Sequence, residues 1–278
     1  MSYKAEETIL YVDKLSLGYK DANGHDKEIL RDVTIVEKDI VRDGVEATGQ
    51  TIAFIGRSGR GKSTLFKALT GLLKPTSGQI LITDMATEDK TDAKQVEEGD
   101  IGFVDQKYTL FRHKTVTQIC EYALRKSKLN KEEKKALITE YLTDWGLLEH
   151  KDKYSGELSG GQRQRAAIIE QMLTSKHFMI LDEPFSGLDV GNIEKVKESF
   201  NKILSANEYN TIIFSTHDIG LAVELADSIY IVGRPEGVTE YSTIVKHFDL
   251  KAMGLAWTPY GEGHNRVLKE IKELLLKS

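Results

Sequence analysis

A glycine-rich segment, Gly56–Ser63, contains the residue types that point most directly to chemistry. It matches the pattern of a phosphate-binding loop, in which spaced glycines precede Lys and then Ser or Thr. Glycines let backbone N–H groups turn toward phosphate oxygens, and the following helix places its positive end at the same anion. In this pattern Lys62 contacts the β- and γ-phosphates of a nucleoside triphosphate and the Ser63 hydroxyl binds Mg²⁺. The expected ATP contacts here are Gly56, Ser58, Gly59, Arg60, Gly61, Lys62, Ser63 and Thr64. The plainer alternative is a glycine loop with a surface lysine.

Two adjacent acids, Asp182 and Glu183, follow the apolar run Phe178–Leu181. At the carboxyl end of a buried strand both side chains can line one cleft. We expect Asp182 to bind Mg²⁺ and Glu183 to orient or deprotonate the attacking water. The alternative is an acidic turn after a core strand, and the phosphate-loop pattern upstream makes the catalytic interpretation the stronger one.

Strands and helices are expected to alternate around these residues. Apolar strands that alternate with helices predict a parallel sheet covered on both faces. The expected strands are residues 51–55, 178–181, 211–216 and 229–232, and the expected helices are residues 62–73, 190–204 and 219–226.

Three other regions have their own patterns. The first fifty residues alternate apolar and polar types between turn signals, which predicts short antiparallel strands, and residues 79–82 form a further strand candidate. Residues 115–175 are helical in pattern, with Asn130 and Glu133 spaced as a capping box. One apolar stripe between residues 267 and 275 predicts a terminal amphipathic helix that packs on the domain.

Composition narrows the class of protein. The 278 residues are 40% hydrophobic and 29% charged, with a net charge of −5, which argues against a general nucleic-acid binder. A single cysteine, Cys120, cannot form a disulfide framework and is expected to be a small buried residue. We expect neither a secretory signal nor a run of about 18 apolar residues able to span a membrane. The expected location is therefore cytoplasmic, with membrane association only through a partner.

A second anion site is predicted at Leu158–Gln162, which is Leu-Ser-Gly-Gly-Gln. Ser159 and Gln162 have capping-box spacing, so Ser159 opens a helix whose free N–H groups lie beside two glycines. A helix N-terminus of this kind attracts anions. The chain thus carries two phosphate-binding surfaces but one phosphate loop.

This segment resembles the signature sequence of ABC ATPases, and the similarity extends from about residue 15 to residue 235. The chain is similar to the ATP-binding subunit of ABC transporters. The resemblance implies an α/β fold, a P-loop NTPase of ABC type: a central, mostly parallel sheet with an N-terminal antiparallel β subdomain and an inserted α-helical subdomain. It implies one domain over residues 1–278, with these parts: 1–50 antiparallel β, 51–105 and 176–240 P-loop core, 106–175 helical subdomain with the signature helix, and 241–278 C-terminal helical extension.

The resemblance also implies roles for residues outside the two motifs. Gln106 matches the Q-loop glutamine, His217 the switch histidine and Asp189 the D-loop aspartate, while Tyr19 resembles the aromatic that stacks on adenine. The implied catalytic residues are Glu183, His217, Lys62 and Gln106, and the implied Mg²⁺ ligands are Ser63, Gln106 and Asp182. The implied contacts to a partner's ATP are Ser159, Gly160, Gly161, Gln162 and Asp189. A lone histidine after a strand or a lone loop tyrosine is otherwise ordinary packing, and an unusually long stretch separates Tyr19 from the phosphate loop.

Some positions depart from the family pattern. Arg112 stands where many family members have proline, and Asp105 stands where an apolar residue is common. In the family, both positions lie near the surface that meets the membrane subunit. Residues 169–171 are Ile-Glu-Gln in place of a small residue, Arg and Ala, and Glu37–Gly49 resembles an insertion. Arg112 and Asp105 bear on coupling to a partner rather than on hydrolysis, and no function is assigned to Glu37–Gly49.

The implied function is ATP hydrolysis that powers solute transport, with import favoured over export, through ATP-driven closure of a head-to-tail dimer. The implied partners are a second ATP-binding subunit, expected to be identical, separate transmembrane permease subunits and a solute-binding protein, with the chain peripheral on the inner face of the cell membrane. Residues 217–235 look most like the nitrate, sulfonate and taurine uptake subgroup, although no residue encodes the substrate. The alternative is a soluble ABC-type ATPase of an assembly or regulatory complex.

Overall fold

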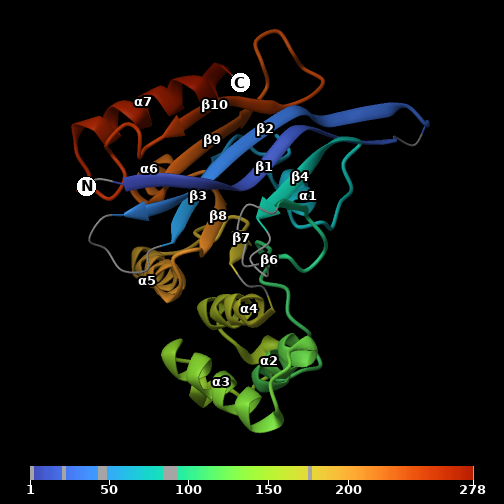
Figure 1. The fold of residues 1–278 in the computed structure, drawn as a ribbon, viewed down its shortest axis with the longest axis vertical. Coiled ribbons are helices and arrows are strands. Elements are labelled where there is room, and N and C mark those ends of the chain that lie inside the picture. Colours follow the sequence, from blue (N-terminus) through green and yellow to red (C-terminus); the bar gives the residue numbers. More distant parts are fainter. Residues whose placement is uncertain (1–2, 21–22, 43–48, 84–92, 175–176, 278) are drawn as a thin grey trace.

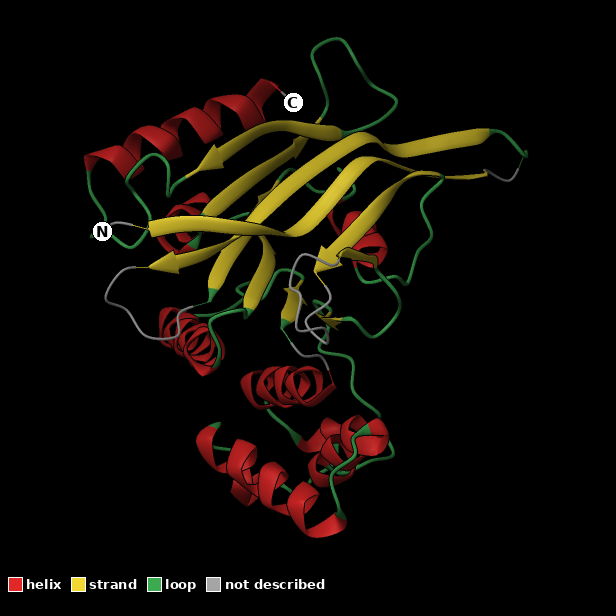
Figure 2. Ribbon diagram, viewed as in Figure 1, coloured by secondary structure: helices red, strands yellow, loops and turns green. Residues whose placement is uncertain are grey.

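The computed structural model describes residues 3–20, 23–42, 49–83, 93–174 and 177–277. Figure 1 shows two sheets and the C-terminal helix in one body, with a group of helices below it. Figure 2 separates the same parts by type, because the strands lie together in the upper body and the lower group is entirely helical. The predicted α/β class is confirmed.

The core sheet contains six strands in the order β10-β9-β3-β8-β7-β6, and all neighbours except β10 and β9 are parallel. Every residue of β3, β7, β8 and β9 is buried, so these strands are continuously apolar or neutral instead of alternating. The predicted strands 178–181 and 211–216 have the expected bounds. The strands are β3 (Gln50–Ile55), β6 (Ile101–Val104), β7 (Phe178–Leu181), β8 (Thr211–Thr216), β9 (Ser228–Gly233) and β10 (Thr243–Asp249).

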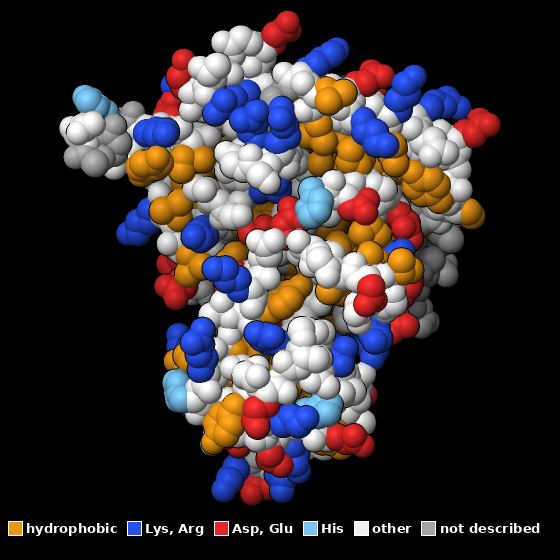
Figure 3. All heavy atoms as spheres, turned by 180° about the vertical axis from the view of Figure 1, so that it is seen from behind, with side chains coloured by type: hydrophobic (Ala, Val, Ile, Leu, Met, Phe, Trp, Pro, Cys, Tyr) orange, Lys and Arg blue, Asp and Glu red, His pale blue; other side chains and the backbone are white. Residues whose placement is uncertain are grey.

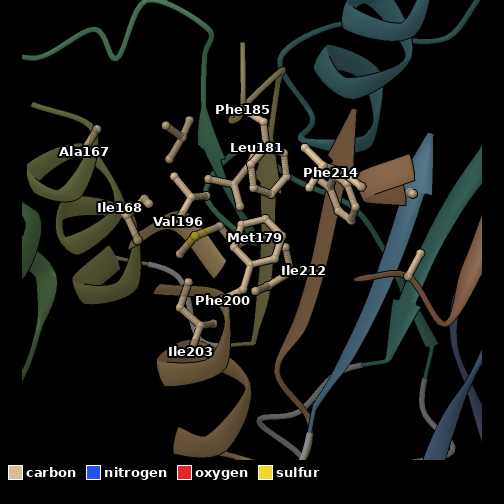
Figure 4. Close-up of a cluster of buried hydrophobic side chains, with 14 of the residues drawn as sticks. Ala167, Ile168, Met179, Leu181, Phe185, Val196, Phe200, Ile203, Ile212 and Phe214 are labelled. Atoms are coloured by element: carbon tan, nitrogen blue, oxygen red, sulfur yellow. The ribbon is translucent and has the colours of Figure 1, made fainter. Parts of the chain in front are cut away.

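Strand β3 divides the interior into two hydrophobic cores because its side chains alternate between the two faces. Ala53 and Ile55 belong to the core shared with most of the helices, whereas Ile52 and Phe54 belong to the core shared with the antiparallel sheet and the helix Lys62–Leu69. The helices of the sheet region are α1 (Lys62–Leu69), α5 (Val190–Ala206), α6 (Ile219–Leu225) and α7 (Glu262–Lys277). Figure 4 shows the first core where α4 (Gly160–Thr174) and α5 pack on β7 and β8.

The antiparallel sheet differs in detail from the expected short strands. It has the order β2-β1-β4-β5, and its two long strands continue through several register shifts. Lys14 and Asp32, both at positive φ, lie in this bulged hairpin. They accommodate the register shifts without ending either strand. Because β4 pairs with β1, part of the region assigned to the P-loop core belongs to this sheet instead. The strands are β1 (Tyr3–Lys20), β2 (Asp26–Arg42), β4 (Ser77–Thr83) and β5 (Ala93–Gln95).

The helical lobe begins after β6 and ends with α4. The predicted capping box is present, because Glu133 donates its N–H to the Asn130 side chain at 3.0 Å and accepts the Asn130 N–H at 2.7 Å. Cys120 is buried in the lobe, and burial raises the pKa of its thiol to about 12, so it is a packing residue. The lobe contains α2 (Val116–Ala123), α3 (Lys131–Asp144) and α4, with short 3₁₀ turns at Leu124–Lys126, Leu148–His150 and Ser155–Glu157.

The C-terminal region is only partly the helical extension that was expected. It begins with β10, which pairs antiparallel with β9, and only then forms α7. Val267 and Ile271 of α7 are buried, so this helix packs on the domain as predicted. Of the predicted insertion, residues 37–42 belong to β2 and residues 43–48 lie outside the described residues. Among the residues that the structure describes, no helix is both long enough and apolar enough to cross a membrane.

Candidate nucleotide-binding site

A cleft of about 610 Å³ lies where the phosphate loop, the acid pair and the β1–β2 hairpin meet. The structure thereby brings together most of the residues that the sequence singled out. These are Tyr19, Ser58, Gly59, Arg60, Gly61, Lys62, Ser63, Thr64, Gln106, Asp182, Glu183 and His217. Gly56 begins the loop behind the cleft wall, where a Cβ would lie 2.3 Å from the carbonyl oxygen of Val232. Only glycine fits at that approach.

The phosphate loop leads directly into the N-terminus of α1. Gly61 precedes the helix at φ +92°, and no side chain caps the first turn. The first N–H groups of α1 therefore have no capping acceptor, which is the arrangement that binds phosphate at helix N-termini. A Cβ at Gly61 would lie 2.9 Å from Ile29 of β2, so the turn depends on glycine for space as well as for conformation.

Lys62 is buried at the base of the cleft. Its Nζ donates to the Gly56 carbonyl oxygen at 2.6 Å and lies 3.9 Å from Oε1 of Glu183. Burial lowers the pKa of Lys62, while the charges of Glu183 and Asp182 act in the opposite direction. The ammonium group is thus held between the loop backbone and the acid pair, where it can reach the terminal phosphates of a nucleotide.

The acid pair is held by a residue that sequence reasoning did not identify. Ser215, near the end of β8, donates its hydroxyl to Oδ1 of Asp182 at 2.6 Å and accepts the N–H of Glu183 at 2.9 Å. Glu183 lies at φ +52°, a conformation that is uncommon outside glycine. Its Oε2 lies 2.8 Å from Nδ1 of His217. The Glu183 carboxylate therefore stands between Lys62 and His217.

We expect Ser215→Ala to lower kcat for ATP hydrolysis about tenfold, because a lost buried hydrogen bond costs roughly 1–3 kcal/mol. The substitution removes the donor to Asp182 and the acceptor for Glu183 N–H, so both carboxylates lose orientation. The ATP dissociation constant should change less than about twofold, since Ser215 does not line the cleft. Steady-state phosphate release and equilibrium ATP binding measure the two effects.

Ser199→Ala, which removes another buried serine from α5, is the matched control. An unchanged kcat for Ser215→Ala would contradict this positioning role.

Gln106 and Tyr19 lie at opposite parts of the chain but line the same cleft. Gln106 follows β6 at the entrance to the helical lobe, with its Nε2 3.5 Å from Oγ of Ser186. Tyr19 is 49% exposed at the end of β1, and the Nζ of Lys27 lies 6.0 Å from the centre of its ring. Strand β2 accounts for much of the long separation of Tyr19 from the phosphate loop.

The signature residues lie elsewhere. The predicted capping box is present, with the Ser159 N–H donated to Gln162 Oε1 at 2.9 Å and the Gln162 N–H to Ser159 Oγ at 3.3 Å. Asp189 caps α5 by accepting the Asn192 N–H at 2.9 Å. None of Ser159, Gly160, Gly161, Gln162 and Asp189 lines the cleft. One chain therefore keeps its two predicted phosphate-binding surfaces apart.

The oxygen-bearing side chains of the cleft fit Mg²⁺. Ser63 supplies a hydroxyl, Asp182 a carboxylate and Gln106 an amide oxygen, and Mg²⁺ is usually held by one or two carboxylates together with substrate phosphates and water. Within the described ranges, no group of three or more His, Cys, Asp or Glu side chains is placed to hold a metal ion by itself.

The family is decided by comparison with known sequences. The model of the family described as "ABC transporter" matches residues 46–186, which include the phosphate loop, the signature segment and the acid pair. This chain belongs to the ABC transporter family. The face of this family member drawn in Figure 3 carries interspersed basic and acidic side chains, in keeping with its modest net charge of −5.

Relatives and solved structures agree with that family. A sulfate/thiosulfate import ATP-binding protein CysA from Thermosynechococcus vestitus is 36% identical over 203 residues, 73% of this chain and 59% of that protein. The arginine transport ATP-binding protein ArtM from Bacillus subtilis is 37% identical over 66% of this chain and 76% of that protein. The ABC fold is shared with cbiO1 from Clostridium perfringens, which is part of the ABC transporter complex cbiONQ. The two structures have a TM-score of 0.66 at 25% identity, and the match covers 98% of this chain and 97% of that one. A second solved structure, an ATP binding subunit of an ABC transporter, has a TM-score of 0.68 at 24% identity over 97% of this chain and all of that chain.

This chain spans 59% and 52% of the lengths of two CysA relatives. The resemblance of residues 217–235 to nitrate, sulfonate and taurine uptake proteins stays a prediction, since the relatives named here carry other substrates in their names.

Proposed function

We propose that this chain hydrolyses ATP and that the energy drives solute import through separate membrane subunits. The observation that carries the proposal is the position of Glu183, whose carboxylate lies 2.8 Å from His217 and 3.9 Å from Lys62 beside the phosphate loop. A carboxylate between a cation and an imidazole, next to a phosphate cradle, is arranged to activate water for attack on a phosphoryl group.

Each residue of the cleft has a distinct part in the proposed reaction. The loop N–H groups and Lys62 bind the phosphates and stabilise the charge that develops on the transferred group. Glu183 accepts a proton from the attacking water, and His217 keeps that carboxylate oriented while contacting the γ-phosphate. Ser63, Asp182 and Gln106 would hold Mg²⁺, which when bound neutralises negative charge on the phosphate oxygens. Gln106 also connects the cleft to the helical lobe, and Tyr19 stacks on the adenine.

The proposed active unit is a head-to-tail dimer. Because the signature residues do not line the chain's own cleft, each ATP would lie between the phosphate loop of one subunit and Ser159–Gln162 of the other. Two identical subunits in this arrangement form a two-fold interface with two composite sites. ATP binding then favours the closed dimer and hydrolysis releases it.

Import is supported by what the relatives are called, since CysA and ArtM are named as import or transport ATP-binding proteins. The membrane path would come from permease subunits, with a solute-binding protein as a further possible partner, and the chain would lie at the inner face of the membrane. Sulfate or thiosulfate and arginine are the first solutes to test, because those relatives carry them in their names. The assembly-complex alternative is less favoured, since these names all refer to transport.

The test is to purify tagged Glu183→Gln protein with ATP and Mg²⁺ from detergent-solubilised membranes of the native host. Lys62→Ala, which lacks the phosphate contact, is the control. We expect a multi-span membrane protein to co-purify with the first variant, and the wild-type complex in liposomes to take up labelled solute only with ATP. Recovery of soluble partners alone would overturn the transport assignment and favour the assembly-complex alternative.

A further inference from the structure

The connection between β9 and β10 forms a wall of the nucleotide cleft that the family motifs do not include. Arg234, Glu240, Tyr241 and Ser242 from this connection line the cleft together with the phosphate loop. Sequence reasoning placed Arg234 and Glu240 in the P-loop core and residues 241–278 in a C-terminal extension, and it assigned none of these wall residues to the site.

The wall is fixed in position by β2. Ser242 donates its N–H to the carbonyl oxygen of Ile29 at 2.9 Å, and its own carbonyl oxygen accepts the Arg31 N–H at 3.0 Å. The Arg31 guanidinium lies 4.0 Å from the centre of the Tyr241 ring, a cation–π contact. These contacts tie the end of the connection to the strand that also carries Ile29 into the cleft.

The start of the wall is fixed by the core sheet. β9 runs parallel to β3 with Ile231 opposite Ile55, so both strands end at the same edge. The backbones of Gly56 and Val232 lie so close together that a Cβ on Gly56 would be 2.3 Å from the Val232 carbonyl oxygen. Arg234 follows only two residues later, which places it beside the first turn of the phosphate loop.

Arg234 lies near a second arginine, Arg60 of the phosphate loop. Both arginines line the cleft. Burial is the main cause of a lowered pKa of Arg60, and the positive charge of Arg234 lowers that pKa further. The Nε of Arg234 is buried and has no hydrogen-bond partner among the described residues. A buried guanidinium N–H of Arg234 without a hydrogen-bond partner is unfavourable, and an anion in the cleft would supply the missing acceptor. Guanidinium groups bind phosphate through paired N–H donors, so a polyphosphate is the anion that matches.

We propose that Arg234, from the wall that the β9–β10 connection forms, binds the polyphosphate of the nucleotide together with Arg60 of the phosphate loop. This inference rests on the proposed function and adds a contact from the β9–β10 connection to the ATP site. It makes the affinity of the chain for nucleotides depend on a residue outside the phosphate-loop, signature and acid-pair motifs.

The test is equilibrium binding of ATP, ADP and adenosine to the purified full chain carrying Arg234→Gln. Loss of one charge-assisted contact is expected to weaken ATP and ADP binding about tenfold, while adenosine binding stays within about twofold. The salt dependence of ATP binding should also become shallower. Arg266→Gln is the matched control, because Arg266 is an exposed arginine of α7 that does not line the cleft. Its ATP affinity should stay within about twofold of wild type.

Arg60→Gln provides a second variant if Arg234→Gln does not fold, and it should give the same pattern. Unchanged ATP affinity in the variants, or an equal loss for adenosine, would overturn the proposal. A wild-type chain that fails to bind ATP would instead overturn the proposed function. Tight wild-type binding that Lys62→Ala abolishes and Arg234→Gln does not affect would overturn only this inference.

Discussion

Replacing Glu183 by Gln is expected to slow ATP hydrolysis at least about a hundredfold, the scale of a lost general base. The amide cannot accept a proton from water, although it is nearly the same shape as the carboxylate. Glu183 already lies at φ +52°, and Gln has the same branching at Cβ, so we expect the substitution to add no new backbone strain. ATP binding should persist, because the phosphate loop and Lys62 are unchanged.

Three measurements test this prediction: phosphate release, ATP affinity, and ATP-dependent dimerisation by size-exclusion chromatography. We expect the variant to bind ATP and to accumulate as a closed dimer. Glu208→Gln, at an exposed carboxylate outside the cleft, is the control and should hydrolyse ATP like the wild type. Wild-type hydrolysis by Glu183→Gln would remove Glu183 from the role of general base.

Replacing Ser159 by Asp is expected to reduce hydrolysis about a hundredfold without weakening ATP binding to the isolated subunit. Asp caps a helix as well as Ser does, so α4 should still begin at the same place. Its negative charge would face the partner's ATP in the closed dimer, and a like charge at such an interface costs several kcal/mol. Ser159→Asn keeps the cap without the charge and should lose much less activity.

Mixing subunits separates a composite site from a local defect. Ser159→Asp protein has an intact phosphate loop, and Lys62→Ala protein has an intact signature segment. A mixed dimer therefore contains one complete site, and hydrolysis should exceed that of either variant alone. No recovery on mixing, under conditions where wild-type subunits dimerise, would contradict the head-to-tail arrangement.

Local features of this protein followed from the sequence because adjacent residues create them. The phosphate loop needs glycines, Lys62 and Ser63 in one short segment, and its conformation depends on backbone freedom at those positions. The capping boxes at Asn130 and Ser159 are also contacts over three residues. Buried parallel strands such as β7 and β8 were predictable because β7 is apolar throughout and β8 contains the apolar run Ile212–Phe214. The alternation of strands and helices then predicted the α/β class.

The tertiary structure alone decided contacts between distant segments. Ser215 meets Asp182 because β8 lies beside β7, with Phe214 opposite Leu181, and no local pattern shows which strands become neighbours. Strand β10 had no clear apolar alternation, and its pairing with β9 came from the sheet edge available to it. Arg234 reaches the cleft because β9 and β3 end together. Such contacts depend on strand order and register, which are set by packing the whole chain, so local residue types could not reveal them.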